Sequence, residues 1–249
     1  MLNATACSSG NTAIAWGYDT VADGIADVML VGGADTFTRS LYCGFHRMSA
    51  LSKSVCKPFD KNRDGVSFGE GAGMLVLEEL EHAKKRGVAI LAEVLGYGIS
   101  NDAYHVTAPE PNGAGFVRAI EQALTTSGTP ADSVGYISAH GTGTQYNDLG
   151  EVRAIKAVFG ERATRIPISS IKATIGHTNG AAAAVAAVAC VLALARQMVP
   201  PTATLSEPDP GLGMDFVMGQ GRATSLSTCL NMSAGFGGAN ACVLLGRAP

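Results

Sequence analysis

Short apolar segments alternate with helical segments along most of the chain, and this alternation limits the possible folds more than any other feature of the sequence. Apolar runs of strand length occur at Val28–Val31, Met74–Leu77, Val88–Gly96, Val134–Ser138 and Ile166–Ser169, with three more short strands expected near Phe216, Thr228 and Ala241. Helical patterns separate them, among them Ser8–Ile25, Gly113–Ser127, Asp148–Phe159 and Asn179–Met198. Strands that are apolar on both faces need helices on both sides of their sheet. We therefore predict a layered α/β protein that forms one compact structural unit.

One of the helical segments is apolar enough to raise the question of a membrane. Gly180–Ala195 has no charged residue, but it is 16 residues long and mostly alanine. A helix needs about 20 apolar residues to span a bilayer. We therefore predict a fully buried helix and no membrane span.

Charge and cysteine content exclude several classes of function. The formal net charge is −3, with 18 basic and 21 acidic residues. A nucleic-acid-binding protein needs a basic surface, so no nucleic-acid partner is expected. The six cysteines include no C-x-x-C pair, so we expect no metal site. A chain of this size does not need disulfides, and we expect reduced thiols in a cytoplasmic protein.

Two helices of similar character begin beside residues that can carry chemistry. Thr5-Ala6-Cys7-Ser8-Ser9-Gly10 opens one helix, and Gly176-His177-Thr178-Asn179-Gly180-Ala181 opens another. Small residues let two helices approach closely, so a pair of such helices related by a pseudo-twofold axis would bring Cys7 and His177 together. The positive end of a helix dipole lowers a thiol pKa, so a nucleophilic Cys7 is one hypothesis. A small buried side chain is the alternative.

Three further motifs contain candidate functional residues. His140 lies in Ala139-His140-Gly141-Thr142-Gly143-Thr144, directly after a predicted strand, where ligands bind in open α/β sheets. Lys172 lies in another segment that follows a strand, and it is costly to bury without a partner, for which Glu151 is a candidate. The glycines around Phe236 expose backbone N–H groups that could stabilise an oxyanion, although a tight hairpin turn is the simpler interpretation. Charges alternate along Phe59–Gly65, as in an ion-pair network.

Taken together, these motifs resemble the β-ketoacyl-acyl carrier protein synthases. The resemblance rests on Cys7, His140, His177 and Phe236 in this order, and on Lys57-Pro58-Phe59-Asp60, Arg63-Asp64-Gly65 and Gly69-Glu70-Gly71-Ala72-Gly73. The two histidines are similar to those of the elongating enzymes of fatty acid and polyketide synthesis. The resemblance implies a thiolase-like αβαβα sandwich, which is usually dimeric. Residues 1–89 would be the end of the first half, including the nucleophile, and residues 90–249 the second half.

The resemblance also implies roles for individual residues in a decarboxylative Claisen condensation. Cys7 would take an acyl chain as a thioester, and His140 and His177 would donate hydrogen bonds to the enolate formed when malonyl-acyl carrier protein loses carbon dioxide. The tetrahedral oxyanion would bind the amides of Cys7 and Phe236, and Phe236 would also gate the acyl pocket.

Supporting and binding roles are implied in the same way. Lys172 and Glu151 would form a buried pair, with Asp102 in the same network. Thr142 and Thr144 would hold the pantetheine arm of the substrate. Asp102 and Gly237 would also contact the substrate. No cofactor of the chain itself is expected, because the phosphopantetheine is carried by the acyl carrier protein.

The sequence departs from the family at its start, because much of the first half would precede Cys7. A sheet that lacks several strands leaves apolar surface and unpaired edges exposed. We therefore expect a homodimer, or a heteromer in which another chain supplies the N-terminal half, or else a truncated product. Two alternatives to a condensing enzyme remain: a thiolase-fold enzyme that transfers acyl groups without decarboxylation, and a non-catalytic or incomplete partner subunit of a heteromeric ketosynthase.

Overall fold

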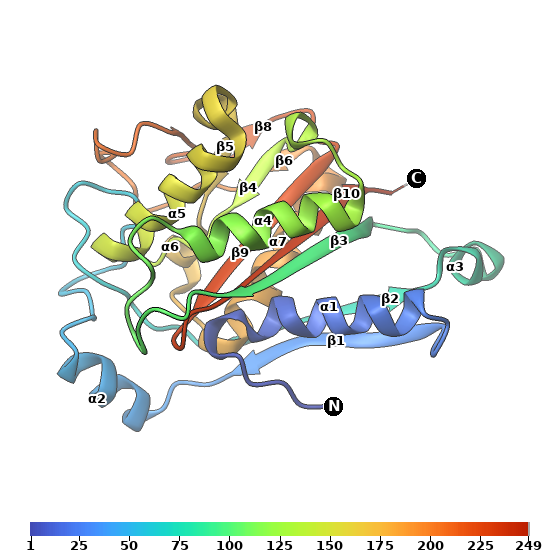
Figure 1. Cartoon of the computed structure of the whole chain (residues 1–249), viewed down its shortest axis with the longest axis horizontal. Helices are drawn as coiled ribbons and strands as arrows, with labels where there is room; N and C mark the ends of the chain where they lie inside the picture. Colours follow the sequence, from blue (N-terminus) through green and yellow to red (C-terminus); the bar gives the residue numbers. More distant parts are fainter. Residues whose placement is uncertain (249) are drawn as a thin grey trace.

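The computed structural model describes residues 1–248, which form two main sheets separated by a pair of helices (Figure 1). A third, short sheet pairs Met198–Val199 with Arg222–Ala223. The strands are β1 (Val28–Asp35), β2 (Gly71–Glu78), β3 (Ala92–Asn101), β4 (Tyr136–Ser138), β5 (Pro167–Ser169), β6 (Met198–Val199), β7 (Asp215–Phe216), β8 (Arg222–Ala223), β9 (Thr228–Gly235) and β10 (Ala239–Arg247). The α-helices are α1 (Ser9–Ala22), α2 (Arg39–Arg47), α3 (Leu80–Arg86), α4 (Ala114–Ser127), α5 (Gln145–Phe159), α6 (Lys172–Ile175) and α7 (Ala182–Arg196). Four short 3₁₀ turns are η1 (Ala6–Ser8), η2 (Ala131–Ser133), η3 (Gly160–Arg165) and η4 (Asn179–Ala181).

The larger sheet has six strands in the order β3-β10-β9-β4-β5-β7. The strands β9, β4, β5 and β7 run parallel, and β10 is antiparallel to both of its neighbours. Helices α4 and α5 cover one face of this sheet. An apolar cluster that includes Phe116, Ile155 and Leu230 fills the space between the helices and the sheet. The predicted layered α/β architecture is confirmed. The division at residues 89 and 90 stays a prediction.

The smaller sheet is the antiparallel pair β1–β2, and its two faces differ sharply. On the inner face, Val31 and its neighbours pack with residues of α1 and α7 in a second apolar cluster. On the outer face, Leu30 is 66% exposed and Val76 is 63% exposed. The predicted buried strand Met74–Leu77 is therefore buried on one side only. Among residues 1–248, no helix covers the outer face, so the described chain has the layers β, α, β and α.

Helices α1 and α7 lie between the two sheets and touch each other at small residues. A Cβ placed on Gly10 would lie 2.4 Å from the backbone nitrogen of Ala184. Because Gly10 follows Cys7 closely and α7 begins shortly after His177, this contact brings the two helix starts together. The segment Asn179–Arg196 is long and apolar enough to cross a membrane by length and composition, but 61% of its residues are buried inside the molecule. Its position between the sheets confirms a core helix, but the helix is not fully buried as predicted, since Leu192 is 41% exposed.

Two other predictions about secondary structure were wrong. The final strands β9 and β10 are not short; they form a long hairpin in the centre of the sheet. Polar residues interrupt their apolar pattern, but these residues are buried and bonded: the Nδ2 group of Asn231 donates to Asn11 Oδ1 at 2.8 Å. The third strand begins at Ala92 rather than Val88.

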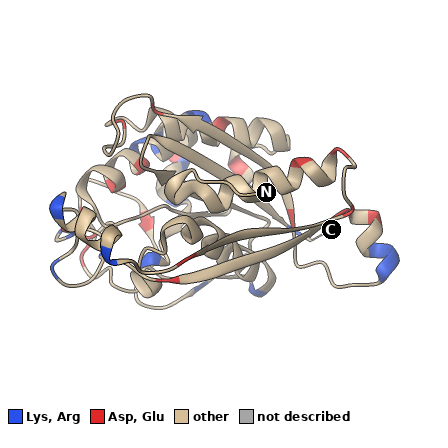
Figure 2. Ribbon diagram, turned by 90° about the horizontal axis from the view of Figure 1, so that it is seen from below, with Lys and Arg blue, Asp and Glu red and all other residues tan. Residues whose placement is uncertain are grey.

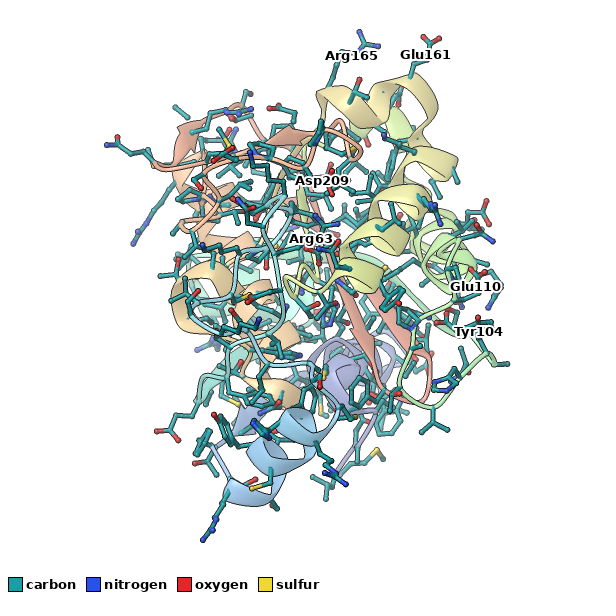
Figure 3. The ribbon with its side chains drawn as sticks, turned by 90° about the vertical axis from the view of Figure 1, so that its left-hand side faces the viewer. Arg63, Tyr104, Glu110, Glu161, Arg165 and Asp209 are labelled. Carbon is teal, nitrogen blue, oxygen red and sulfur yellow. The ribbon has the colours of Figure 1, made fainter. Side chains whose placement is uncertain are left out.

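Charged residues lie at both ends of the ribbon, with the two signs interspersed (Figure 2). The expected ion-pair network of Phe59–Gly65 is confirmed: Arg63, which is 4% exposed, bonds Asp209 at 2.7 Å and lies 3.7 Å from Asp148 (Figure 3). The Arg63 charge offsets part of the effect of burial, which raises the pKa of Asp148.

Candidate active site

Cys7 lies in the η1 turn that leads directly into α1, and its side chain is half-buried. Gly235, at the end of β9, comes so close that an added Cβ would lie 3.0 Å from the Cys7 nitrogen. Within residues 1–248, neither the Cys7 amide nor the Phe236 amide has a hydrogen-bond partner. Two free N–H groups, brought together by the close approach of Gly235, fit the expected oxyanion-binding pair.

The prediction that the helix start favours the Cys7 thiolate is wrong for the free protein. Burial raises the pKa of the Cys7 thiol to about 11; the Lys172 cation opposes this shift and the Asp35 carboxylate adds to it. Desolvation of the thiolate therefore exceeds the favourable charge effects. At neutral pH, Cys7 carries its proton and needs a base to become a nucleophile.

His140 follows β4, and its backbone is held from both sides. Its N–H donates to Glu151 Oε1 at 2.5 Å, and its carbonyl accepts from Lys172 Nζ at 2.5 Å. The Gly141 N–H donates to the other Glu151 oxygen at 2.8 Å. Lys172 and Glu151 are buried as predicted, but they form no direct ion pair. They are linked through the His140 backbone, whose N–H bonds the carboxylate and whose carbonyl bonds the ammonium group.

His177 is fixed by its backbone and by one nitrogen of its ring. Its N–H donates to Ser67 O at 2.7 Å, and its Nδ1 accepts the Asn179 N–H at 3.1 Å. Because Nδ1 acts as an acceptor in this bond, the neutral ring carries its proton on Nε2. The His140 and His177 rings lie edge to face, with centroids 5.5 Å apart. Burial, and then the Lys172 charge, lower the pKa of both histidines well below the ordinary value, so both rings are neutral.

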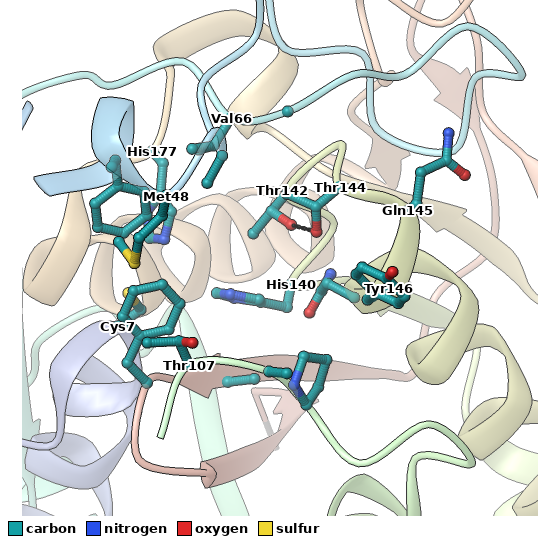
Figure 4. A pocket seen from close by; sticks show the side chains of 18 of the residues that line it. Cys7, Met48, Val66, Thr107, His140, Thr142, Thr144, Gln145, Tyr146 and His177 are labelled. Carbon is teal, nitrogen blue, oxygen red and sulfur yellow. Dashed lines mark hydrogen bonds between the residues drawn. The ribbon is translucent and has the colours of Figure 1, made fainter. Parts of the chain in front are cut away.

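Cys7, His140 and His177 line one pocket of about 410 Å³. In Figure 4, Cys7 and His177 lie at the left, His140 lies in the middle with Thr142 and Thr144 above it, and Gln145 and Tyr146 lie at the right. The two threonine hydroxyls lie 3.0 Å apart. The structure therefore brings the predicted nucleophile, both histidines and both threonines to a single cavity.

Phe236 also lines this pocket, and it stacks on a residue that sequence reasoning missed. The rings of Phe236 and Phe45 are parallel within 9°, with centroids 5.1 Å apart. Phe45 belongs to α2, a helix that we did not predict and that buries none of its residues. The sequence signal for the start of this helix was Thr38, because threonine is a preferred N-cap residue. In the structure, its hydroxyl accepts the Leu41 N–H at 3.3 Å. Tyr146, exposed at the pocket edge on α5, was also missed.

Two predicted substrate-binding residues lie outside the pocket, and those predictions are corrected. Asp102 makes no contact with Lys172 or Glu151; its carboxylate accepts from Asn240 Nδ2 at 2.7 Å and from the Glu110 N–H at 3.0 Å. Gly237 is exposed in the β9–β10 turn, where its N–H donates to Val106 O at 2.7 Å. The polar groups of both residues bond other parts of the chain. These bonds connect the loops next to Phe236.

No cluster of three or more His, Cys, Asp or Glu side chains able to hold a metal exists among residues 1–248. A reactive cysteine at the start of one central helix, and a histidine at the start of its partner, are instead the features of a thiolase-like protein. The comparisons with known proteins identify the family.

The chain belongs to the β-ketoacyl synthase family. The family's N-terminal domain matches residues 1–83, and its C-terminal domain matches residues 91–206. The 3-oxoacyl-[acyl-carrier-protein] synthase 2 of Synechocystis is 46% identical over 243 residues, which are 95% of this chain and 58% of that protein. The family resemblance inferred from the motifs is therefore confirmed.

Solved ketosynthase structures confirm the thiolase-like fold. The ishigamide ketosynthase/chain length factor has a TM-score of 0.95 at 43% identity, covering 98% of this chain and 60% of that one. A type II polyketide ketosynthase in complex with its acyl-carrier protein, bound to a hexaketide, has a TM-score of 0.95 at 38% identity, covering 98% of this chain and 62% of that one. The chain thus spans about three fifths of the length of these relatives.

Proposed function

We propose that this chain carries the catalytic centre of a β-ketoacyl synthase, an acyltransferase that joins an acyl thioester to malonyl-acyl carrier protein with loss of carbon dioxide. The observation that carries the proposal is the meeting of Cys7, His140 and His177 in one pocket. The first step is attack of the Cys7 sulfur on the acyl thioester. The Cys7–acyl bond forms, the carrier thiolate leaves, and the thiol proton ends on that leaving group.

The histidine geometry supports a division of labour between the two rings. Cys7 needs a base, because burial raises the pKa of its thiol to about 11. His177 Nδ1 already accepts the Asn179 N–H and its Nε2 carries the ring proton, so neither nitrogen has a free lone pair for the Cys7 proton. The His140 side chain has no hydrogen-bond partner within residues 1–248. We therefore assign His140 as the group that takes the Cys7 proton and passes it to the leaving thiolate.

His177 Nε2–H is then placed to stabilise the enolate. When the malonyl group loses carbon dioxide, the electron pair of the broken C–C bond moves onto the thioester oxygen, which needs N–H donors. Neutral rings serve this role: His177 donates through its fixed Nε2–H, and His140, neutral again after passing on the Cys7 proton, donates through the ring nitrogen that kept its own hydrogen. The enolate carbon attacks the Cys7 thioester, and the resulting oxyanion meets the free amides of Cys7 and Phe236 before the Cys7 thiolate leaves.

The proposed substrates bring their own prosthetic group, so the mechanism needs no cofactor bound to this chain. The phosphopantetheine arm arrives on an acyl carrier protein and passes Thr142 and Thr144 at the edge of the pocket. One related ketosynthase structure contains an acyl-carrier protein. We propose the same partner here, and a cytoplasmic location, in fatty acid or polyketide synthesis.

We also propose that a second polypeptide covers the outer face of the smaller sheet. The outer face of β1–β2 exposes Leu30 and Val76, which a stable isolated protein would bury. We propose either a homodimer or a heteromer in which another chain supplies the N-terminal half of the fold. The same exposed face favours the alternative function, an incomplete partner subunit that is inactive alone. Size measurement by light scattering, with and without a polypeptide that carries the family's N-terminal segment, distinguishes these assemblies.

Mass spectrometry tests the chemistry directly. Incubation with an acyl thioester should add one acyl group, mapped to Cys7, and malonyl-acyl carrier protein should then release carbon dioxide. Cys7→Ala should take up no acyl group, whereas the matched variant Cys43→Ala, at an exposed thiol on α2, should be acylated normally. Acyl transfer without carbon dioxide release would instead support a non-decarboxylating enzyme, and unchanged activity of a complex containing Cys7→Ala would support a non-catalytic subunit.

A further inference from the structure

We propose that Asp35 is a positioning residue for His177, acting through the amide of Gly180. The inference deepens the proposed function, because it rests on the His177 Nε2–H acting as an oxyanion donor. Asp35 ends β1, and its Oδ2 accepts the Gly180 N–H at 3.0 Å. The two residues are 145 positions apart in the sequence, so this bond joins the smaller sheet to the start of the α7 segment.

The backbones of these two segments lie close enough for this bond to be firm. A Cβ placed on Gly33 would lie 2.8 Å from Gly180 O, and one placed on Gly180 would lie 3.3 Å from Asp35 Oδ2. The other Asp35 oxygen, Oδ1, accepts the Thr36 N–H at 3.0 Å. The carboxylate is thus fixed by its own strand and aimed at η4.

Asn179 transmits the effect of Asp35 to the imidazole. It adopts a left-handed backbone with φ of 48°, a conformation that asparagine tolerates but that surrounding contacts must maintain. The peptide on its C-terminal side is held by Asp35, and the N–H on its N-terminal side donates to His177 Nδ1 at 3.1 Å. If the Gly180 bond is lost, Asn179 can rotate, and Nδ1 then loses the donor that keeps the ring proton on Nε2.

The charge of Asp35 has a second effect, on Cys7. Asp35 on β1 raises the pKa of the Cys7 thiol, and Lys172 on α6 lowers it; of the other titratable groups that line the pocket, His140 and His177 are neutral, and Asp64 and Tyr146 complete the set. An Asp35→Asn variant removes the charge and keeps one side-chain oxygen that can accept the Gly180 N–H, while the bond from the Thr36 N–H is lost. An Asp35→Ala variant removes both. The two substitutions therefore separate the hydrogen bond from the charge.

The experiment uses the full chain labelled with ¹⁵N-histidine, and the ring nitrogen shifts of His177 report which nitrogen carries the proton. We expect Asp35→Asn to keep the Nε2–H form and Asp35→Ala to give a mixture of both forms. Glu70→Gln is the matched control: Glu70 lies at the same end of the smaller sheet and accepts from Thr36 and Phe37, with no bond to Gly180. It should leave His177 unchanged. Thermal unfolding of each variant verifies that it is folded.

Alkylation of Cys7 by iodoacetamide gives the second readout. With the charge removed, Asp35→Asn should react faster than the parent protein at pH 8, because loss of the Asp35 charge lowers the pKa of the Cys7 thiol and raises its thiolate fraction. A folded Asp35→Ala with His177 still wholly in the Nε2–H form would overturn the proposal. So would loss of that form in Glu70→Gln, or equal loss in Asp35→Asn and Asp35→Ala. Neither readout requires turnover, so a protein that shows these shifts but stays inactive when the N-terminal half of the fold is supplied would refute the proposed function and leave this inference standing.

Discussion

Substitution of Gly10 by alanine tests whether the contact between α1 and α7 sets the geometry of the site. The new Cβ would lie 2.4 Å from Ala184 N and 2.9 Å from Ala184 Cβ, whereas ordinary contacts begin at 3.4 Å. Because the nearest atom belongs to the backbone, it cannot rotate away. The two helices must separate by about 1 Å, the difference between the ordinary and the available distance.

The expected cost follows from two opposing effects. Alanine is favoured over glycine in a helix by about 1 kcal/mol. Overpacking a close contact typically costs about 1–3 kcal/mol, and here the neighbour is main chain, so the upper part of that range applies. We therefore expect Gly10→Ala to lower the free energy of unfolding by about 1–2 kcal/mol, which for a domain of this size lowers Tm by about 2–8 °C.

Gly44→Ala is the matched control for this substitution. Gly44 is also within a helix, α2, but an added Cβ there meets no atom within 4 Å. This variant should gain the helix preference alone and match or exceed the stability of the parent. The assay is urea and thermal unfolding of both variants. A Gly10→Ala protein as stable as Gly44→Ala would refute the reasoning, because it would mean that the helices separate without cost.

Three further predictions concern the site and its support. His177→Ala should slow carbon dioxide release from malonyl-acyl carrier protein by about 10²–10³-fold, as expected for loss of one oxyanion donor, while acylation of Cys7 measured by mass spectrometry continues. Lys172→Met should raise the pKa of the Cys7 thiol further above about 11, because its cation lowers that pKa, and the pH profile of alkylation should move upward accordingly; a downward move would contradict the charge assignment. Arg63→Ala should cost about 3–5 kcal/mol in urea unfolding, because it leaves the buried Asp148 and the partly buried Asp209 without their cation, whereas Lys61→Ala, at an exposed pair, should leave the urea midpoint nearly unchanged.

The central elements of the fold and the chemical residues could be predicted from the sequence because their signals are local. The uncharged alanine run before Arg196 indicated a buried helix by composition alone. His140 and His177 were found because each lies in a short motif of glycine and small residues that follows a predicted strand. The hairpin β9–β10 was underestimated, since Asn231 and its polar neighbours interrupt the apolar pattern and are satisfied only by distant partners.

The errors in the site share one physical cause. Glu151 and Lys172 were expected to pair directly because both are costly to bury, yet each charge is satisfied by the His140 backbone, which no residue pattern indicates. Asp102 was assigned to the same network from the family resemblance, but its two oxygens accept instead from Asn240 Nδ2 on β10 and from the Glu110 N–H. Side-chain types show that a buried charge needs a partner, and they do not show which partner lies within reach.

By itself, the sequence determined the layered α/β class, the family resemblance and the identity of Cys7, His140 and His177, because strand and helix periodicity and short motifs depend on neighbours in the chain. Only the tertiary structure decided the protonation of these groups. The thiol of Cys7 is held protonated by burial, not ionised by the helix start, and the His177 tautomer is fixed by one backbone amide. Desolvation and hydrogen-bond partners depend on which distant segments meet. Here they are determined by the contact of Gly10 with Ala184 and by the contact of Gly235 with Cys7.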